Sequence, residues 1–340
     1  MAFAAQYRYA ETPGLGKDPV THRVIFDTDI GIDDAMALLF LHFAPNVTLE
    51  AITTVSGNAR ISDVTHNALY MAERFGITAP VYRGAAGPIG PALGTGYPDF
   101  VHGANGLGNI ETPVESREEE HQTAPQAIVD LAREHPGEID LVAVGRLTNI
   151  AKALDLCPQL PQLLRSVVVM GGVFMLRNHA GNVSPVAEAN MAGDPAAADQ
   201  VFGSGLPVTI VGLDVTEETI MDEAFITQLR DEAGDAGECI HAITRYYFDF
   251  YESISDRRAC PIHDSSAVAC LLAPGLYGAE EGPVRVVSEG IAMGQTILGR
   301  TPDRYASEDW LDRPSVRVCT SVDGEGVKKL YLDTLRLAGQ

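Results

Sequence analysis

Residues 24–39 read VIFDTDIGIDDAMALL, a short β-type run that passes through an acidic turn into an apolar helix. Four carboxylates, those of Asp27, Asp29, Asp33 and Asp34, fall within eight residues. One aspartate in the first helical turn would be enough to cap the helix, so helix stability does not explain the others. Like charges packed this closely repel one another, and their oxygens are the ligands that Ca²⁺ or Mg²⁺ prefers. The stretch therefore predicts a strand-to-helix turn that binds a hard cation, with a solvated acidic turn as the alternative.

The remaining chain alternates strands with helices, which predicts a parallel sheet with right-handed crossovers. Strands are expected at residues 22–26, 49–55, 81–82, 139–144, 166–170 and 207–213. Helices are expected between them, a mostly helical segment at residues 221–255, and short strands from residue 282 to about 332. The predicted fold class is therefore α/β, a single-domain open, mostly parallel, Rossmann-like sheet flanked by helices, with a small C-terminal β extension. This domain is expected to span residues 21–340, after a loose leader at residues 1–20.

Composition narrows the class of partners. The formal net charge is -22, with 24 basic residues against 46 acidic ones, so neither a nucleic acid nor an anionic membrane is an expected partner. No run approaches the length of a membrane-spanning helix, and the five cysteines are scattered without a CxxC pair. These features favour a reduced, cytoplasmic protein.

Polar residues follow several of the predicted strands, and in open α/β sheets ligands bind outside the carboxyl ends of the strands. Asn58, Thr148 and Met170 lie at such ends, as does the acidic turn. Two irregular stretches, residues 83–122 and 173–193, would cover the same edge. They carry His102, Asn182, Glu188 and Asn190, and the pair His263 and Asp264 opens a later helix.

This inventory of a hard cation, hydroxyl-binding amides, a carboxylate base and a histidine suits hydrolysis of a sugar derivative. A cation acidifies water, and a nearby carboxylate can complete its deprotonation at neutral pH. Surrounding negative charge would also stabilise an oxocarbenium-like transition state.

At this point the sequence resembles the nucleoside hydrolases, calcium-dependent N-ribohydrolases that include the inosine-uridine preferring type. The similar pieces run in family order from about residue 22 to residue 275. They are DTDIGIDDA at 27–35, SGN at 56–58, VHG at 101–103, GRLTNIA at 145–151, VMGG at 169–172, GNVSP at 181–185, EAN at 188–190 and HD at 263–264.

The resemblance implies roles for individual residues. Asp29, Asp34, the backbone carbonyl of Thr148 and Asp264 would bind one Ca²⁺, with Asp29 also the general base. Asp33 and Asn190 would hold the ribose 2′- and 3′-hydroxyls. Asn182, Glu188 and Met170 would lie near the 5′ end of the ribose, and Asn58 would lie near the metal. His263 would be the leaving-group acid, and Tyr247 and Tyr251 would lie beside the base. The family is also commonly dimeric or tetrameric, so a homodimer or homotetramer is expected.

The sequence departs from the family pattern at several positions. Ile30 and Arg146 stand where proline is usual, and Ala189 stands where phenylalanine is common. The loop after His102 reads Gly-Ala-Asn-Gly where an acidic residue and serine are commoner. The single tryptophan, Trp310, lies in the tail, which argues against the purine-specific subtype with its tryptophan sandwich.

Other interpretations stay open from the sequence. His263 and His102 could be structural, Tyr247 and Tyr251 could be core aromatics, and Met170 rests on the resemblance alone. A haloacid-dehalogenase-type phosphatase would use Asp27 as nucleophile with Mg²⁺, but it leaves the Asn, Glu and His-Asp motifs unexplained. A non-catalytic calcium-dependent sugar-binding protein would keep the metal ligands without needing a spare carboxylate and a histidine. The preferred base is not specified by these residues.

Overall fold

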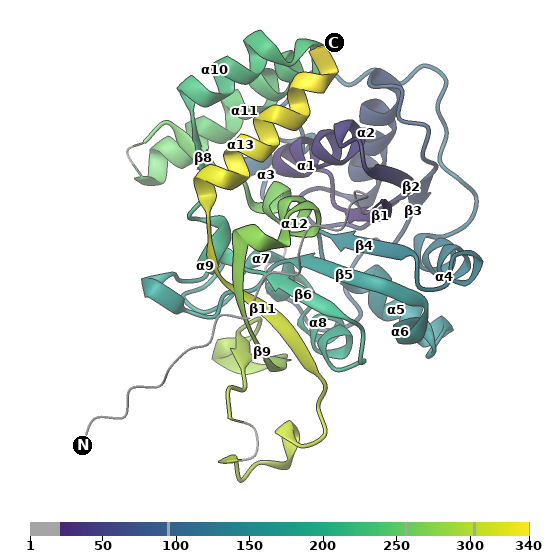
Figure 1. The fold of residues 1–340 in the computed structure, drawn as a ribbon, viewed down its shortest axis with the longest axis vertical. Helices are drawn as coiled ribbons and strands as arrows, with labels where there is room; N and C mark the ends of the chain where they lie inside the picture. The colour runs from purple at the N-terminus through teal and green to yellow at the C-terminus, as the bar shows by residue number, and fades with distance from the viewer. Residues whose placement is uncertain (1–20, 94–95, 256, 302–303, 340) are drawn as a thin grey trace.

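Strand β1 (His22–Thr28) lies inside the main sheet and pairs in parallel with β2 (Val47–Thr54) on one side and β4 (Ile139–Ala143) on the other. The computed structural model describes residues 21–93, 96–255, 257–301 and 304–339, so the predicted leader at residues 1–20 lies outside the described residues. Within them the main sheet has nine strands in the order β10-β9-β11-β6-β5-β4-β1-β2-β3 (Figure 1). The others are β3 (Val81–Arg83), β5 (Leu164–Met170), β6 (Val208–Val211), β9 (Tyr277–Val286), β10 (Thr296–Leu298) and β11 (Ser315–Val322).

In the main sheet the seven strands from β11 to β3 in this order run parallel, and β9 pairs in antiparallel fashion with β11 on one side and β10 on the other. This confirms the predicted α/β class and the β extension at the C-terminal end. The order reverses between β1 and β4, because the chain first builds outward through β2 and β3 and then returns to the other side of β1. Such a switch point opens a crevice at the carboxyl ends of the two strands.

Helices cover both faces of the sheet, so the central strands are buried on both sides and read as continuous apolar runs. Val24 and Phe26 of β1 join the hydrophobic core on one face, and Ile25 joins the core on the other. The core on the first face is shared by α1 (Ile32–Phe43), α2 (Ile61–Arg74) and α12 (His263–Leu272) and by the helices outside them, α10 (Glu223–Glu232), α11 (Gly234–Ser255) and α13 (Gly324–Leu335). Of these outer helices, α11 and α13 pack on α1, and α10 packs on α11. The second face packs against α4 (Ala124–Glu134), α5 (Thr148–Leu156), α6 (Leu160–Leu163) and α8 (Pro195–Phe202).

Helix α1 is buried along ten of its twelve residues, because α11, α12 and α13 pack around it (Figure 1). An α-helix that is apolar on all sides is stable only when it is surrounded in this way. The burial anchors the acidic turn that precedes the helix. The site therefore stands on one of the most enclosed elements of the protein.

The C-terminal prediction was partly wrong. Strands β9, β10 and β11 form as a β extension, but residues 324–335 are the helix α13 and not a strand. Asp323 caps this helix by accepting a hydrogen bond from Gly326 N–H. Val327, Tyr331 and Leu335 are buried at helical spacing, which is a pattern visible in the sequence.

The remaining elements are short and lie largely in the connections. They are α3 (Asp99–His102), α7 (Ala189–Gly193), α9 (Leu213–Thr216) and the two-stranded sheet of β7 (Ile220–Asp222) and β8 (Ala259–Pro261). Short 3₁₀ turns occur at Leu176–Asn178, Pro274–Leu276, Gly290–Ala292, Glu308–Trp310 and Arg336–Gly339. No helix among the described residues has both the length and the apolar character needed to cross a membrane.

Candidate active site

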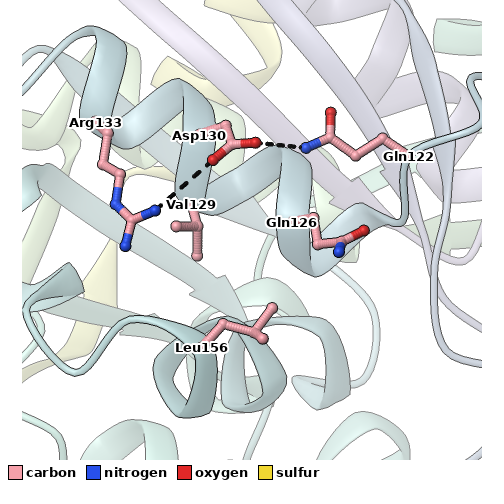
Figure 2. A pocket seen from close by; sticks show the side chains of 6 residues that line it. All are labelled: Gln122, Gln126, Val129, Asp130, Arg133 and Leu156. Carbon is pink, nitrogen blue, oxygen red and sulfur yellow. Dashed lines mark hydrogen bonds and ion pairs between the residues drawn. The ribbon is translucent and has the colours of Figure 1, made fainter.

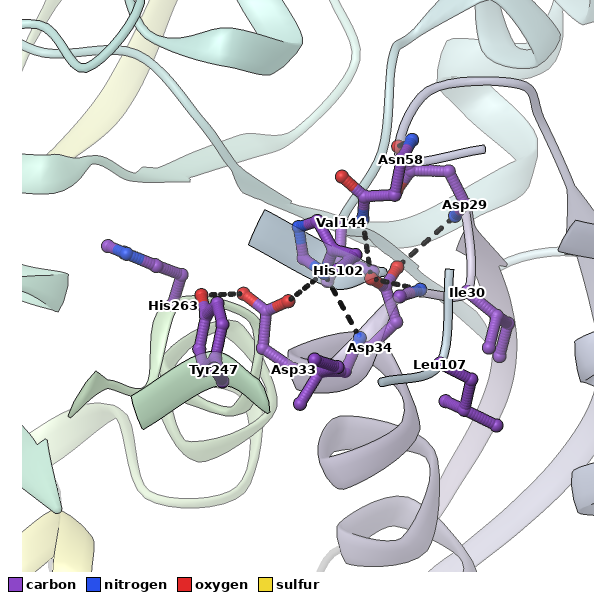
Figure 3. A network of polar contacts seen from close by, with 12 residues as sticks. Asp29, Ile30, Asp33, Asp34, Asn58, His102, Leu107, Val144, Tyr247 and His263 are labelled. Atoms are coloured by element: carbon purple, nitrogen blue, oxygen red, sulfur yellow. Dashed lines mark hydrogen bonds and ion pairs between the residues drawn. The ribbon is translucent and has the colours of Figure 1, made fainter. Parts of the chain in front are cut away.

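The carboxylates of the acidic turn meet at the switch point between β1 and β4. Asp34, in the first turn of α1, is held by four donors, which fixes its orientation. Its Oδ1 accepts from Thr28 Oγ1 at 2.6 Å and from the Asp29 N–H at 3.2 Å. Its Oδ2 accepts from the Gly31 N–H at 2.8 Å and from Asn58 Nδ2 at 2.9 Å (Figure 3).

Asp29 is buried, with one carboxylate oxygen held and the other free. Its Oδ2 accepts from the Asn58 N–H at 2.8 Å, and its Oδ1 has no hydrogen-bond partner among the described residues. A Cβ at residue 57 would lie 1.8 Å from this Oδ2, so only glycine fits at Gly57. Burial, followed by the charge of Asp34, raises the pKa of Asp29 well above its usual range.

Asp33 shows the same asymmetry. Its Oδ2 accepts from the Tyr247 hydroxyl at 3.2 Å, while its Oδ1 is buried and without a hydrogen bond, 3.9 Å from His102 Nδ1 (Figure 3). His102 Nδ1 itself accepts from the Ile32 N–H at 3.2 Å, so the proton of a neutral His102 lies on Nε2. Burial, and then Asp34, raises the pKa of Asp33 to about 7.

Asp264, at the start of α12, completes the cluster. Ligand oxygens of Asp33, Asp34 and Asp264 lie within 4.8 Å of one another. Burial raises the pKa of Asp264, and the charges of Asp33, Asp34 and Asp29 raise it further. Unpartnered buried oxygens and mutually repelling carboxylates are the features that a bound hard cation would resolve. The donor set therefore fits a divalent metal ion.

The structure places Thr148, whose carbonyl was the expected ligand, away from the cavities at the acidic cluster. Thr148 begins α5, its hydroxyl donates to Asp194 Oδ2 at 2.6 Å, and it lines neither of the two cavities at the acidic cluster. In the first turn of a helix the carbonyl points along the helix toward the residue four positions later. The carbonyl of this segment that reaches the site is that of Val144, directly after β4. It accepts from Asn190 Nδ2 at 2.7 Å and lies beside the cavity.

Asp27 also differs from the expectation that all four turn carboxylates share one site. Neighbouring residues of a strand point to opposite faces, so Asp27 points away from the side chains of Phe26 and Thr28. Its Oδ1 accepts from Thr53 Oγ1 at 2.6 Å and from Asn149 Nδ2 at 2.8 Å. Asp27 is fully buried and lines neither cavity at the cluster, so it is not placed to act as a phosphatase nucleophile.

A cavity of about 400 Å³ opens next to the cluster. Eleven of the sequence-predicted residues line it: Asp33, Asn58, His102, Met170, Asn182, Glu188, Asn190, Tyr247, Tyr251, His263 and Asp264. Asp29 instead lines an adjoining cavity of about 300 Å³, which shares Asn58 and Asn190 with the first and also contains Arg146. The predicted residues, scattered from 29 to 264, are therefore brought together.

A chain of hydroxyls and a histidine leads along one wall toward Asp33. Thr216 Oγ1 lies 2.8 Å from His263 Nδ1, and His263 Nε2 lies 3.0 Å from the Tyr251 hydroxyl. The Tyr251 and Tyr247 hydroxyls are 3.5 Å apart. Because Tyr247 donates to Asp33, a consistent arrangement has each donor pointing toward that carboxylate. Burial lowers the pKa of His263 to about 4, so the imidazole is neutral at pH 7 and donates through one nitrogen.

The opposite wall is built by the loop before α8. Glu188 caps α7 and accepts three backbone N–H groups, those of Gly172, Asn190 and Met191. These bonds orient the loop so that Asn182 and Asn190 border the cavity, and Asn182 Oδ1 accepts from the Ala189 N–H at 3.0 Å. Met170 packs beneath, with its sulfur 3.5 Å from Asn190 Nδ2.

A second hollow between α4 and α5, of about 340 Å³, does not have the character of a binding site (Figure 2). Its charged residue Asp130 is already paired, with Gln122 Nε2 at 2.6 Å and with Arg133 at 3.9 Å. These are exposed contacts between surface side chains. The chemistry is therefore concentrated at the carboxyl ends of β1 and β4.

Several residues of the site were not predicted from the sequence. Val144 contributes through its backbone, which no side-chain pattern reveals. Phe100, Phe250 and Ile254 line the outer part of the cavity, and the Phe100 and Phe250 rings lie 5.7 Å apart. The crowded aromatic segment near residue 250 was the available signal. Glu217, after α9, also lines the cavity and carried no motif.

Comparison with known proteins gives one consistent family. A family model described as inosine-uridine preferring nucleoside hydrolase matches residues 24–329. The chain is 35% identical over 315 residues to a probable uridine nucleosidase 2 of Arabidopsis thaliana, covering 92% of this chain and 97% of that protein. It is 34% identical over 325 residues to the inosine-uridine preferring nucleoside hydrolase of Crithidia fasciculata, covering 93% and 98%. Among solved structures, a plant nucleoside hydrolase superposes with a TM-score of 0.87 at 34% identity, covering 92% of this chain and 98% of the other.

Proposed function

The chain belongs to the inosine-uridine preferring nucleoside hydrolase family, and from this premise we propose that it hydrolyses the N-glycosidic bond of ribonucleosides with Ca²⁺ bound at the acidic cluster. The observation that carries the proposal is the cluster of Asp33, Asp34 and Asp264, with Asp29 beside it through the hydrogen bond from its N–H to Asp34. Asp29 and Asp33 each keep a buried carboxylate oxygen without a hydrogen bond. Hydroxyl-bearing substrates and a hard cation would use those oxygens.

The ligands that would hold the cation are Asp29, Asp34, Asp264 and the Val144 carbonyl. The first three follow the family resemblance, and the fourth replaces the Thr148 carbonyl for the reason given above. A divalent cation at such a site supplies acidification of water at neutral pH. Its oxygen-only ligand set favours Ca²⁺ or Mg²⁺ over metals that prefer thiolate or imidazole.

Asp29 is suited to act as the general base. Its Oδ2 is fixed by the Asn58 N–H, so its free Oδ1 has a defined position from which to accept a proton from water.

Asp33 and Asn190 would hold the ribose hydroxyls. Asp33 Oδ1 is an unused acceptor, and Asn190 uses its Nδ2 for the Val144 carbonyl, which leaves its Oδ1 for a substrate hydroxyl. Glu188, already bonded to three N–H groups, would act mainly by shaping the loop near the 5′ end, with Asn182 as its polar contact.

The leaving base would lie against Tyr247, Tyr251 and His263. His263 is neutral at pH 7, so it would act as a hydrogen-bond donor to the leaving base at the His263–Tyr251 contact, with Thr216 fixing its Nδ1, rather than as a free imidazolium. This refines the role that the resemblance implies for His263.

The test is ribose release from inosine, guanosine, adenosine, uridine and cytidine, measured with and without a calcium chelator. Turnover that is lost on chelation and restored by added Ca²⁺ would support the proposal. Turnover that survives complete removal of divalent metal would contradict the role of the acidic cluster. Bound ribose without turnover would favour a sugar-binding protein.

A further inference from the structure

One carboxylate in the main cavity lies outside the acidic cluster, on the residue whose backbone caps the C-terminal end of α9. Glu217 follows α9, and its Oε2 lies 2.6 Å from His179 Nδ1. Its other oxygen, Oε1, makes no hydrogen bond to any residue that the structure describes. The other carboxylates that line this cavity already have assigned positions. Asp33 and Asp264 belong to the acidic cluster, and Glu188 accepts hydrogen bonds from three backbone N–H groups.

Glu217 lies at the end of the cavity where the base would sit. It directly follows Thr216, whose hydroxyl contacts His263, and its charge is felt at the hydroxyl of Tyr251. The neighbouring outer wall is apolar, formed by Phe100, Phe250 and Ile254. In ligand pockets of this kind a few polar groups on an apolar wall set orientation and specificity.

The loop that carries His179 is held in an unusual backbone conformation. Met175, Arg177 and Asn178 have positive φ angles of 57°, 48° and 69°. Left-handed conformations of non-glycine residues are strained, and they persist only where the surroundings impose them. Here Asp214 accepts the N–H groups of Phe174 and Leu176 at 2.7 and 2.6 Å, which ties the loop to α9.

His179 therefore reaches Glu217 from a restrained position. It also lies 3.5 Å from Glu218, which pairs with Arg177 at 2.7 Å but does not line the cavity. The two adjacent glutamates thus have similar partners, and only Glu217 faces the cavity. This makes Glu218 a matched control.

We propose that Glu217 Oε1 accepts a hydrogen bond from a ring N–H of the substrate base, with His179 as its positioning residue. The inference rests on the proposed function and assigns the base preference of the same site. An ionised carboxylate is an acceptor only. It therefore favours bases with a lactam N–H, as in inosine, guanosine and uridine, over bases that present a ring-nitrogen lone pair at that position. A site built to accept a hydrogen bond discriminates strongly against a substrate that lacks the donor.

The test compares kcat/KM for inosine and for purine riboside, which has no ring N–H and no exocyclic donor. In Glu217→Gln, the His179 N–H still donates to the side-chain oxygen of residue 217, so the new amide NH₂ faces the base. A hydrogen-bond acceptor is thereby replaced by a donor at that position. We expect the ratio of inosine to purine riboside to fall by about 10- to 100-fold, the range for a hydrogen bond to a charged group. Glu218→Gln should leave the ratio unchanged, and thermal unfolding checks that both variants fold.

A second comparison uses the wild-type protein. N1-methylation of inosine removes the donor, so 1-methylinosine should lose kcat/KM against inosine, and this loss should shrink in Glu217→Gln. If the ratio of kcat/KM for inosine to that for purine riboside is unchanged in Glu217→Gln, whether both values fall equally or neither falls, the assignment is overturned. Nucleoside hydrolysis itself would remain intact. Absence of ribose release from every nucleoside with the wild-type protein would overturn the proposed function and this inference with it.

Discussion

Replacing Asp33 by asparagine should make the metal-free protein more stable and at the same time inactive. Asp33 is buried, its Oδ1 has no hydrogen bond, and burial followed by Asp34 raises its pKa from 3.8 to about 7. The folded state therefore holds a proton more tightly than the unfolded state. Ionisation of Asp33 therefore lowers the free energy of unfolding of the wild-type protein. This destabilisation is absent below pH 3.8, grows as the pH rises, and is complete above pH 7.

The shift sets the size of the effect. A difference of about three pKa units between the folded and unfolded states corresponds to about 4 kcal/mol of unfolding free energy, present above pH 7 in the absence of metal. Asparagine fits the same space without a charge. Its oxygen can accept from the Tyr247 hydroxyl, so that hydrogen bond is retained.

The assay is urea unfolding in a chelator at pH 4 and pH 8. Asp33→Asn should be more stable than the wild type by up to about 4 kcal/mol at pH 8 and nearly equal at pH 4. Saturating Ca²⁺ should remove the gain, because the cation stabilises the ionised wild-type cluster. Ribose release should be lost in either case.

A paired carboxylate provides the control of opposite sign. Burial alone would raise the pKa of Asp140, but hydrogen bonds from Arg165, His22 and Ser166 hold it at about 2. Its stabilising contribution is present above pH 3.8 and is lost as the pH falls toward 2. Asp140→Asn should therefore be less stable than the wild type at pH 8. If Asp33→Asn is also less stable at pH 8 in chelator, the reasoning about charge repulsion in the cluster is refuted.

Three further predictions follow from the geometry of the site. Gly57→Ala places a Cβ 1.8 Å from Asp29 Oδ2, so ribose release should fall by roughly 100-fold while circular dichroism stays native; near-normal turnover would exclude the assigned position of Asp29. His263→Ala should reduce kcat for nucleosides and spare a nitrophenyl riboside, whose leaving group needs no proton; equal losses on both would remove the leaving-group role. Thr148→Val removes the hydrogen bond from the Thr148 hydroxyl to Asp194 and should lower the free energy of unfolding in urea by about 1 to 3 kcal/mol. The Ca²⁺ affinity measured by calorimetry should not change; weakened Ca²⁺ binding would instead place Thr148 at the metal site.

Much of the fold was predictable because its signals are local. The run at residues 24–39 contains a strand, a tight turn and a buried helix within one continuous stretch, and each depends on neighbours a few residues away. The same holds for Asp194 followed by Pro195, a cap residue and a first helical residue that start α8. The missed helix α13 is a local pattern too, since Val327, Tyr331 and Leu335 recur at helical spacing. That error came from extending the strand interpretation too far.

The sequence by itself determined the α/β class, the hard-ligand chemistry of the acidic turn and the family to which the motifs belong. The tertiary structure decided which groups face one another. Whether the Val144 or the Thr148 carbonyl reaches the cavity depends on where β4 ends and α5 begins, and Asp27 turns away because adjacent strand residues alternate. The contact between His179 and Glu217 joins residues 38 apart in the chain. Such contacts are fixed by the packing of separate strands and helices, and local periodicity carries no information about them.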